Sequence, residues 1–157
     1  MTRTTWAMAF LAGCAARRTS ALEGSYQLGE PGGDWQRVEA GGADYAWFNR
    51  ALSATIYSDS NCGKRFEDRP LADLAKSLVS GVGTGAPTRE ETFTLDGREA
   101  WLGVIPGRLD GIAVQLGVGV LKKDNCTYDV LYVADPAQFD AGYAAFEAVL
   151  RDLRTGG

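Results

Sequence analysis

The chain has 157 residues, of which 45% are apolar and 23% charged, a composition typical of one globular domain with a hydrophobic core. The net charge is −4 and there is no long Lys/Arg block, which argues against nucleic acid as the main partner, since phosphate binding requires a concentrated basic face. Histidine is absent, and with it the commonest general base and the commonest metal ligand.

Residues 1–13 are typical of a secretion signal peptide. Arg3 supplies the positive charge that such peptides carry, and residues 6–12 form a short apolar segment. A transmembrane helix needs about 20 apolar residues, so this segment is too short to span a membrane. The sequence therefore predicts export. The alternative is an ordinary buried N-terminus that contains a free cysteine.

The end of the apolar segment resembles the lipobox of bacterial lipoproteins, in the four residues Leu11, Ala12, Gly13 and Cys14. The resemblance implies cleavage before Cys14, a diacylglycerol on its thiol and acylation of the new amino terminus. Ala15, rather than aspartate, follows the cysteine, which by resemblance to Gram-negative lipoproteins favours the outer membrane, facing the periplasm. We predict that residues 14–25 form a flexible tether and that residues 26–157 form a single domain.

The first half of the domain predicts three strands and a helix. Residues 35–38, 44–48 and 54–58 are rich in β-branched and aromatic side chains, which favours strands. Residues 59–69 are polar and predict a loop. Pro70 suits the first position of a helix. An apolar stripe with helical spacing follows: Leu71, Leu74, Ala75, Leu78 and Val82.

The second half predicts a four-stranded meander, over residues 92–95, 98–105, 112–121 and 126–134. The Asp-Gly pair at 96–97 is a strong two-residue hairpin signal, and the Pro-Gly pair at 106–107 predicts a break. In the last strand, Tyr128, Val130 and Tyr132 fall on one face. Such a meander buries one face and needs helices to cover it.

A second helix is predicted to start at Asp135-Pro136, with Gln138 placed as in a capping box. Its apolar stripe is the clearest in the chain: Phe139, Tyr143, Phe146, Leu150 and Leu153. The order is three strands, a helix, four strands and a helix. We therefore predict an α+β fold with a largely antiparallel sheet of about seven strands, covered by helices.

Three cysteines are an odd number, which calls for an explanation. With Cys14 taken by lipid, Cys62 and Cys126 remain, each preceded by asparagine. Export would place them in an oxidising compartment, where disulfides form. We expect a disulfide that ties the first three strands to the meander, with Cα atoms about 4.4–6.8 Å apart. Two independent buried thiols are the alternative.

The sequence predicts no catalytic, cofactor or metal site. The two cysteines lack the spacing of a zinc site, and the glycine runs lack the spacing of a phosphate loop. A carboxylate-dependent hydrolase would need two acids facing each other across a cleft, and the acidic pairs at 67–68, 90–91 and 135/140 are more simply solvated surface. Core packing is expected for at least two of Trp35, Trp47 and Trp101.

Within residues 35–154, four segments resemble small bacterial envelope lipoproteins with a PsbP-like/Mog-like domain: Ala54–Tyr57 with Asn61-Cys62-Gly63, Leu95–Ala100, Leu121–Asp129 and the closing Phe-rich helix. The resemblance implies an α/β/α sandwich that serves as a binding or assembly module. It provides no catalytic set. The photosystem and Ran partners for which the fold is named are not transferred.

We therefore expect a lipid-anchored envelope lipoprotein with a binding or assembly-accessory role and no enzymatic activity. Its partners would be the membrane, through the N-terminal lipid, and a protein or small molecule that the sequence does not identify. An envelope hydrolase that uses carboxylates and a cytoplasmic protein with a misread start are the alternatives.

Overall fold

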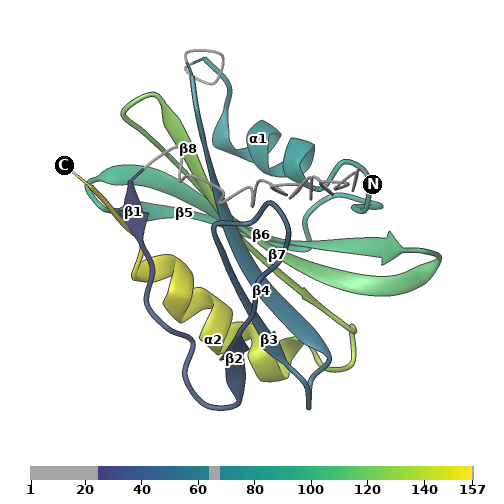
Figure 1. Ribbon diagram of the computed structural model, residues 1–157. Coiled ribbons are helices and arrows are strands. Elements are labelled where there is room, and N and C mark those ends of the chain that lie inside the picture. The colour runs from purple at the N-terminus through teal and green to yellow at the C-terminus, as the bar shows by residue number, and fades with distance from the viewer. Residues whose placement is uncertain (1–24, 64–67, 157) are drawn as a thin grey trace, which may run out of the picture.

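The computed structural model describes residues 25–63 and 68–156. The signal peptide predicted at residues 1–13, the lipobox with Cys14, and residues 14–24 of the tether lie outside the described residues. The described chain forms three layers, with one helix on each face of a central sheet (Figure 1).

The central sheet has seven antiparallel strands in the order β2-β3-β4-β8-β7-β6-β5. Their bounds are β2 Trp35–Arg37, β3 Tyr45–Asn49, β4 Ala54–Cys62, β5 Arg89–Leu95, β6 Arg98–Leu109, β7 Ile112–Lys123 and β8 Cys126–Ala134. The predicted α+β class and the order of elements along the chain are confirmed. Within each half of the sheet consecutive strands are neighbours, and the β4–β8 pair joins the two halves.

Two further strands, β1 (Tyr26–Gln27) and β9 (Arg154–Thr155), pair with each other. Figure 1 shows this small ribbon at the left, beside the end of α2. Neither strand can be predicted from the sequence, because a two-residue strand has no periodicity.

The helices cover opposite faces. Helix α1 (Leu71–Leu78) lies on β6 and β7, and helix α2 (Phe139–Arg151) lies mainly on β8 and β7. Tyr128, Val130 and Tyr132 face α2, as their alternation predicts, whereas Leu131 packs in the cluster under α1. Both faces of the sheet are therefore buried, which confirms the α/β/α sandwich that the resemblance implied, whereas the pattern of the meander alone indicated one buried face.

Three hairpins of the meander use two-residue turns with positive φ at both positions, the conformation of a type I′ turn. The turns are Asp96-Gly97, Asp110-Gly111 and Asp124-Asn125. The break predicted at Pro106-Gly107 is wrong, since β6 continues to Leu109 and turns only at Asp110. Hydrogen-bonded and non-hydrogen-bonded pairs alternate from the turn at Asp110, and this alternation makes Pro106 and Gln115 a non-hydrogen-bonded pair. The N–H that proline lacks therefore removes no hydrogen bond to β7.

The loop predicted from residue 59 begins too early, because β4 continues through Cys62 in register with β8. Pro70 precedes helix α1 as its N-cap residue instead of opening it. Within the predicted stripe of α1, Leu78 is 44% exposed, and the neighbouring Val79 is buried in its place.

The predicted helix start at Asp135-Pro136 and its capping box are wrong. Helix α2 begins at Phe139, its N-cap residue Gln138 has no side-chain cap, and the Asp135 carboxylate accepts the Ala137 N–H in the preceding turn.

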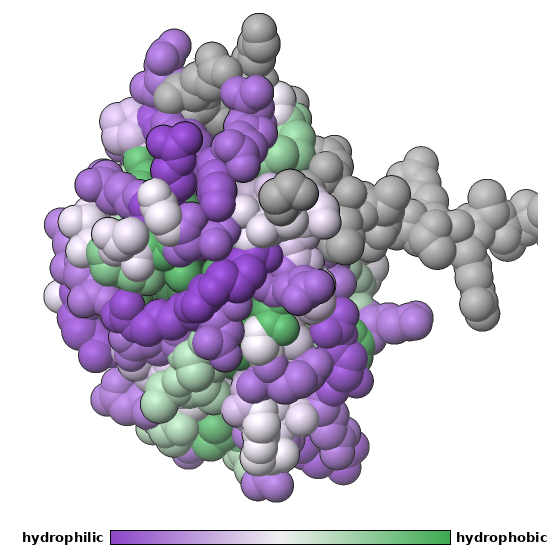
Figure 2. Space-filling model, turned by 90° about the vertical axis from the view of Figure 1, so that its left-hand side faces the viewer, coloured by the Kyte–Doolittle hydropathy of each residue, from purple (hydrophilic) through white to green (hydrophobic). Residues whose placement is uncertain are grey.

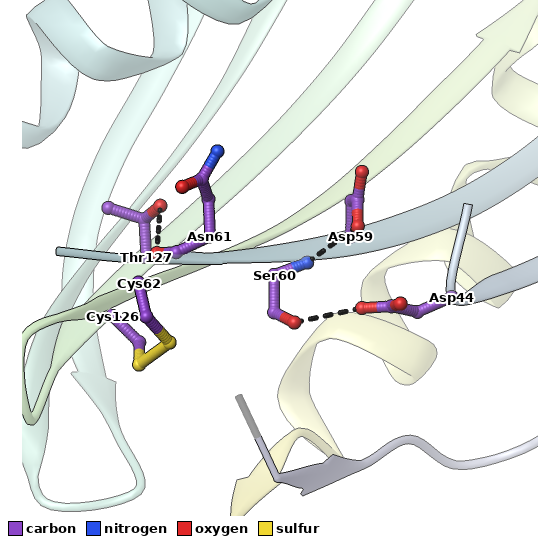
Figure 3. The surroundings of a disulfide bond; sticks show 7 residues. All are labelled: Asp44, Asp59, Ser60, Asn61, Cys62, Cys126 and Thr127. Carbon is purple, nitrogen blue, oxygen red and sulfur yellow. Dashed lines mark hydrogen bonds between the residues drawn. A yellow bond between two sulfur atoms is a disulfide. The ribbon is translucent and has the colours of Figure 1, made fainter. Parts of the chain in front are cut away.

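The structure contains the Cys62–Cys126 disulfide (Figure 3). The two cysteines lie directly opposite each other on β4 and β8, with Cα atoms 3.9 Å apart. This Cα–Cα distance is shorter than the expected range. The Gly63 N–H donates to the Asn125 carbonyl, so the neighbouring pair, Cys62 and Cys126, is a non-hydrogen-bonded pair. In such pairs the Cα atoms of antiparallel strands approach most closely. The bond joins the two halves of the sheet.

We predict that Cys62→Ser combined with Cys126→Ser lowers stability by roughly 4 kcal/mol, because the bond closes a loop with a sequence separation of 64. For a domain of this size the melting temperature should fall by about 10 °C. Thermal unfolding followed by circular dichroism measures the change. A reducing agent should lower the melting temperature of the wild type and leave that of the double variant unchanged. Equal melting temperatures for oxidised and reduced wild type would contradict the prediction.

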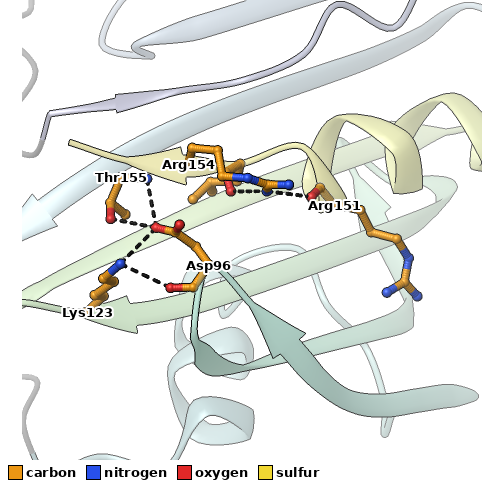
Figure 4. A network of polar contacts seen from close by, with 6 residues as sticks. Asp96, Lys123, Arg151, Arg154 and Thr155 are labelled. Atoms are coloured by element: carbon orange, nitrogen blue, oxygen red, sulfur yellow. Dashed lines mark hydrogen bonds and ion pairs between the residues drawn. The ribbon is translucent and has the colours of Figure 1, made fainter. Parts of the chain in front are cut away.

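The turn residue Asp96 fastens the C-terminal segment to the meander (Figure 4). Its Oδ2 accepts the Thr155 hydroxyl at 2.6 Å, the Thr155 N–H at 2.9 Å and the Lys123 ammonium at 3.0 Å. These hydrogen bonds, those of Thr155 foremost, hold the pKa of Asp96 well below its usual range. The carboxylate thus links the β5–β6 turn, β7 and β9.

Asp96→Asn retains a side chain that tolerates positive φ but removes the charge, and we expect it to cost about 1–3 kcal/mol at pH 7. Because folding lowers the pKa of Asp96, this contribution is present above about pH 4 and disappears as the pH falls further. Urea unfolding at pH 7 and pH 3 measures both effects. Asp110→Asn is the matched control, since Asp110 occupies the same turn position with the same φ of 49°. If both variants lose equal stability, the network is not the cause.

Candidate functional site

A pocket of about 220 Å³ lies between helix α1 and the face of the sheet formed by β4, β8 and β7. Its polar lining comes from both layers, with Asp59, Asn61, Thr127 and Asp129 on the sheet, and Arg69 and Ser77 on the helical side. Its apolar lining is Leu74, Leu78 and Val120. The pocket thus combines a buried acid, a cation and an apolar wall.

The alternation of β4 places Asp59 and Asn61 on the α1 face and Ser60 and Cys62 on the α2 face, as Figure 3 shows. The register then sets Asp59 opposite Asp129 and Asn61 opposite Thr127. The floor of the pocket is thus two consecutive cross-strand pairs of oxygen-bearing side chains. Like charges directly opposite each other destabilise a sheet, which makes the Asp59–Asp129 pair unusual.

The opposite wall of the pocket is fixed by contacts of the segment that leads into α1. The Arg69 guanidinium donates to Ser77 Oγ at 2.7 Å, and the Lys122 ammonium of β7 donates to the Arg69 carbonyl at 2.9 Å. Ser77 Oγ in turn donates to the carbonyl of Asp73. These contacts hold the guanidinium on the helical side of the pocket.

Asp129 is the most perturbed acid of the site. Asp129 is only 5% exposed. This burial, together with the negative charges of Asp59 and Asp44, raises the pKa of Asp129 to about 8. Its carboxyl group is therefore mostly neutral at pH 7. Burial, aided by Asp129, also raises the pKa of Tyr57. A buried acid with a shifted pKa in a pocket is a common property of functional sites.

On the other face of the sheet, Asp44 belongs to a structural network. Its Oδ2 accepts hydrogen bonds from the Tyr26 hydroxyl at 3.0 Å and from Ser60 Oγ at 2.9 Å (Figure 3). Burial raises the pKa of Tyr26 far above its usual range. This network fixes β1 to β3 and β4. The charge of Asp44 acts on the Asp129 carboxyl group, and Ser58 Oγ, which contacts the Tyr26 hydroxyl, donates to the Asp129 backbone carbonyl.

Two other hollows lie outside this pocket. One of about 430 Å³ continues from Asp59 past Thr55 and Tyr57 to the loop at residues 40–43. Another, of about 250 Å³, lies between β5 and α2 and is lined by charged groups such as Arg89, Glu91 and Glu147. Figure 2 shows a hydrophilic band crossing one face of the molecule between separate hydrophobic patches. Neither hollow is lined by a carboxyl group that is as deeply buried as that of Asp129 and has its pKa raised as far.

The residues singled out from the sequence have varied locations. The acidic residues Glu90, Glu91, Asp135 and Asp140 are exposed, as the solvated-surface interpretation predicts. Trp47 and Trp101 are buried in the core and Trp35 is partly buried, in agreement with the expectation for at least two of them. In the part of the chain that the structure describes, no group of three His, Cys, Asp or Glu side chains is placed to hold a metal ion.

Sequence reasoning missed the Asp59–Asp129 pair. The polar pattern predicts a loop at Asp59, and the pattern of the last strand includes Asp129 without indicating that it is buried. One signal was available, because Asp129 is a lone acid between Leu131 and Thr127 on a face that the strand pattern makes apolar. Its partner depends on the β4–β8 register, which no local pattern reveals.

The raised pKa of Asp129 predicts that the stability of the folded protein depends on pH. The unfolded chain releases the Asp129 proton near its usual pKa of 3.8, whereas the folded protein keeps it to about pH 8. Stability should therefore fall as the pH rises through this window, by up to about 1.4 kcal/mol per pH unit. Asp129→Asn removes the ionisable group at nearly constant shape, so the variant should become more stable than the wild type toward pH 7.5.

Urea unfolding of the wild type and Asp129→Asn at pH 4.5, 6 and 7.5 measures the difference. The exposed Asp135 provides the control Asp135→Asn, which should track the wild type at every pH. Parallel curves for the wild type and Asp129→Asn would show that Asp129 ionises normally in the folded protein.

Over residues 25–63 and 68–156, no helix has both the length and the apolar character that crossing a membrane requires. The sequence matches no protein-family model and no curated protein.

Solved structures match the fold. CyanoP, the cyanobacterial PsbP of Synechocystis, has a TM-score of 0.58 at 11% identity, over 85% of this chain and 94% of CyanoP. LpqN of Mycobacterium tuberculosis, described as involved in cell envelope biogenesis, has a TM-score of 0.56 at 14% identity, over 86% of both chains. The Saccharomyces cerevisiae Ran-binding protein Mog1p has a TM-score of 0.55 at 13% identity, over 83% of this chain and 95% of Mog1p. The described chain therefore has a PsbP-like/Mog-like α+β fold.

Proposed function

We propose that the chain is an envelope lipoprotein, anchored by lipid on Cys14, whose PsbP-like/Mog-like domain acts as a binding or assembly-accessory module. The lipid would hold the domain at the membrane through the tether of residues 14–25. The proposed location is the outer membrane, facing the periplasm, on the basis of Ala15 after the cysteine.

The observation that carries the proposal is the Cys62–Cys126 disulfide. Disulfides persist in oxidising compartments and are rare in the cytosol. The bond uses the two cysteines of the domain and leaves Cys14, within the sequence that resembles a lipobox, as the remaining thiol. Export and lipid attachment together account for all three cysteines. The fold of LpqN, a protein described as involved in cell envelope biogenesis, supports the same location.

The geometry of the pocket favours binding over hydrolysis. A glycosidase places two carboxyl groups on either side of the bond that it cleaves, about 5 Å or more apart. Here Asp59 and Asp129 lie side by side on the floor of the pocket, on the same face of two adjacent strands. Such a pair can hold a ligand on the floor of a pocket but does not flank a substrate. We therefore propose that the module binds and does not catalyse.

We predict that Cys14→Ser releases the protein from the membrane. One acyl chain gives only marginal membrane binding, whereas the two or three chains of a bacterial lipoprotein anchor stably. The wild type should fractionate with membranes and incorporate labelled palmitate, and Cys14→Ser should do neither.

The matched control is the pair Cys62→Ser and Cys126→Ser, which removes the other two cysteines and should leave both labelling and membrane fractionation intact. Separation of inner from outer membranes then tests the proposed location. A wild-type protein that is soluble and unlabelled would overturn the lipoprotein proposal.

A further inference from the structure

The two edges of the central sheet differ in length. Strand β2 forms one edge with three residues, Trp35–Arg37, whereas β5 forms the other with seven, Arg89–Leu95. A long edge strand presents unpaired backbone N–H and C=O groups, which can pair with a strand of another chain. Helix α1 lies on β6 and β7, and helix α2 lies mainly on β8 and β7, so the layer that each helix forms is centred away from β5.

The outward-facing backbone groups of β5 belong to Glu90, Thr92 and Thr94. The alternation of hydrogen-bonded pairs, counted from the two-residue turn at Asp96, directs the N–H and C=O groups of these three residues away from β6. Over residues 25–63 and 68–156, these groups make no hydrogen bond. All three residues are exposed. The edge is therefore open to another strand.

The charges of β5 are confined to one half of the strand. Charged side chains on an edge strand normally prevent pairing with other chains. Here Arg89, Glu90 and Glu91 occupy the first half, and residues 92–95 are uncharged. When two copies of β5 pair in antiparallel orientation, the charged half of each strand lies against the uncharged half of the other. This distribution favours a second copy of the chain as the partner.

One register aligns the two strands over their full length and places no like charges opposite each other. It sets Thr92 opposite Thr92 of the second copy. The other opposite pairs are then Arg89 with Leu95, Glu90 with Thr94 and Glu91 with Phe93. A shift of two residues is the smallest that keeps each side chain on its face of the sheet. Such a shift puts Glu91 opposite Glu91 of the second copy, or Glu90 opposite Asp96, and like charges in opposite positions are destabilising.

Arg151 of α2 reinforces this register. Its guanidinium carbon lies 4.4 Å from the centroid of the Phe93 ring, and its Nη2 donates to Glu91 Oε1 at 2.6 Å. Its Nη1 makes no hydrogen bond within the described chain. Glu91 and Phe93 of the second copy would form a non-hydrogen-bonded pair, in which side chains lie closest. The Arg151 guanidinium above Phe93 of one copy thus lies beside Glu91 of the other.

We propose that two copies of this chain form a dimer by antiparallel pairing of β5 with β5, about a two-fold axis at Thr92, which joins both domains in one continuous sheet. Three hydrogen-bonded pairs form across the axis, each with two N–H···O bonds, and satisfy the outward groups of Glu90, Thr92 and Thr94. Pairing of one edge with itself closes after two copies, whereas pairing of β5 with β2 would build an open chain of molecules. The dimer does not depend on the lipid anchor, because β5 lies within the folded domain.

Sedimentation equilibrium of the full chain carrying Cys14→Ser, which removes the proposed site of lipid attachment, tests the proposal. We expect a reversible equilibrium between monomer and dimer. Thr92→Pro should weaken the dimer at least about tenfold, because proline removes the outward N–H at the axis and leaves the hydrogen bonds to β6 intact. Thr92→Val keeps the N–H and suits a strand, so this matched control should dimerise like the parent chain.

Charge substitutions test the register. Thr92→Lys and Thr92→Glu each place like charges opposite each other at the axis, so either variant alone should be monomeric, and an equal mixture of the two should dimerise. Thr94→Lys places its ammonium group opposite Glu90 of the second copy and should strengthen the dimer. Ser80→Lys makes the same change of charge at an exposed site outside β5 and should leave the equilibrium unchanged.

Cysteine cross-linking tests the geometry directly. In a hydrogen-bonded pair the two Cα atoms lie about 5.5 Å apart, within the range for a disulfide. Thr92→Cys in the Cys14→Ser chain should therefore give a covalent dimer on mild oxidation. Glu90→Cys and Thr94→Cys lie opposite each other and not opposite themselves, so each should cross-link only in a mixture of the two.

A chain that stays monomeric throughout the concentration series would overturn the proposal, as would a dimer that neither Thr92→Pro nor Thr92→Lys weakens. Circular dichroism verifies that each variant is folded. If the Thr92 variants are unfolded, the effect of Thr94→Lys and the cross-linking of the Glu90→Cys and Thr94→Cys mixture decide. These results leave the membrane anchor untouched, because anchoring is measured separately by Cys14→Ser fractionation.

Discussion

The pairing of β4 with β8 joins the two halves of the central sheet, and the rest of the domain depends on it. Each half of the sheet is built from consecutive hairpins, so local turns suffice to form it, but the two halves meet only along this one ladder. The disulfide Cys62–Cys126 lies at one end of the ladder, and the Asp59–Asp129 pair lies three residues along it. The covalent staple and the acid pair are thus consequences of the same register.

Local chemistry explains why much of the fold could be predicted. The Asp96-Gly97 turn, the alternation of Tyr128, Val130 and Tyr132, and the stripe of α2 depend on residues a few positions apart. The errors arose where a local signal competed with tertiary pairing. Pro106 suggested a break, but its missing N–H faces away from β7. Polar residues after Ser58 suggested a loop, but pairing with β8 makes them a strand.

The site lay beyond sequence reasoning for a physical reason. Asp59 and Asp129 are separated by a helix and three strands, and only the β4–β8 register places one opposite the other. A shift of β4 by one residue would turn Asp59 to the other face of the sheet, away from Asp129. Composition indicated that acids were plentiful, but burial alone distinguishes Asp129 from Glu90 or Asp135, which are exposed.

The β1–β9 ribbon has a mechanical consequence. Because Tyr26 pairs with Thr155, the chain enters and leaves the folded domain at the same place, fixed there by the hydrogen bond from the Gly156 N–H to the Ser25 carbonyl. A load applied between the two ends would peel these few hydrogen bonds one at a time before it reached the central sheet. A reporter fused after Gly156 would therefore lie beside Ser25, at the point where the described domain begins.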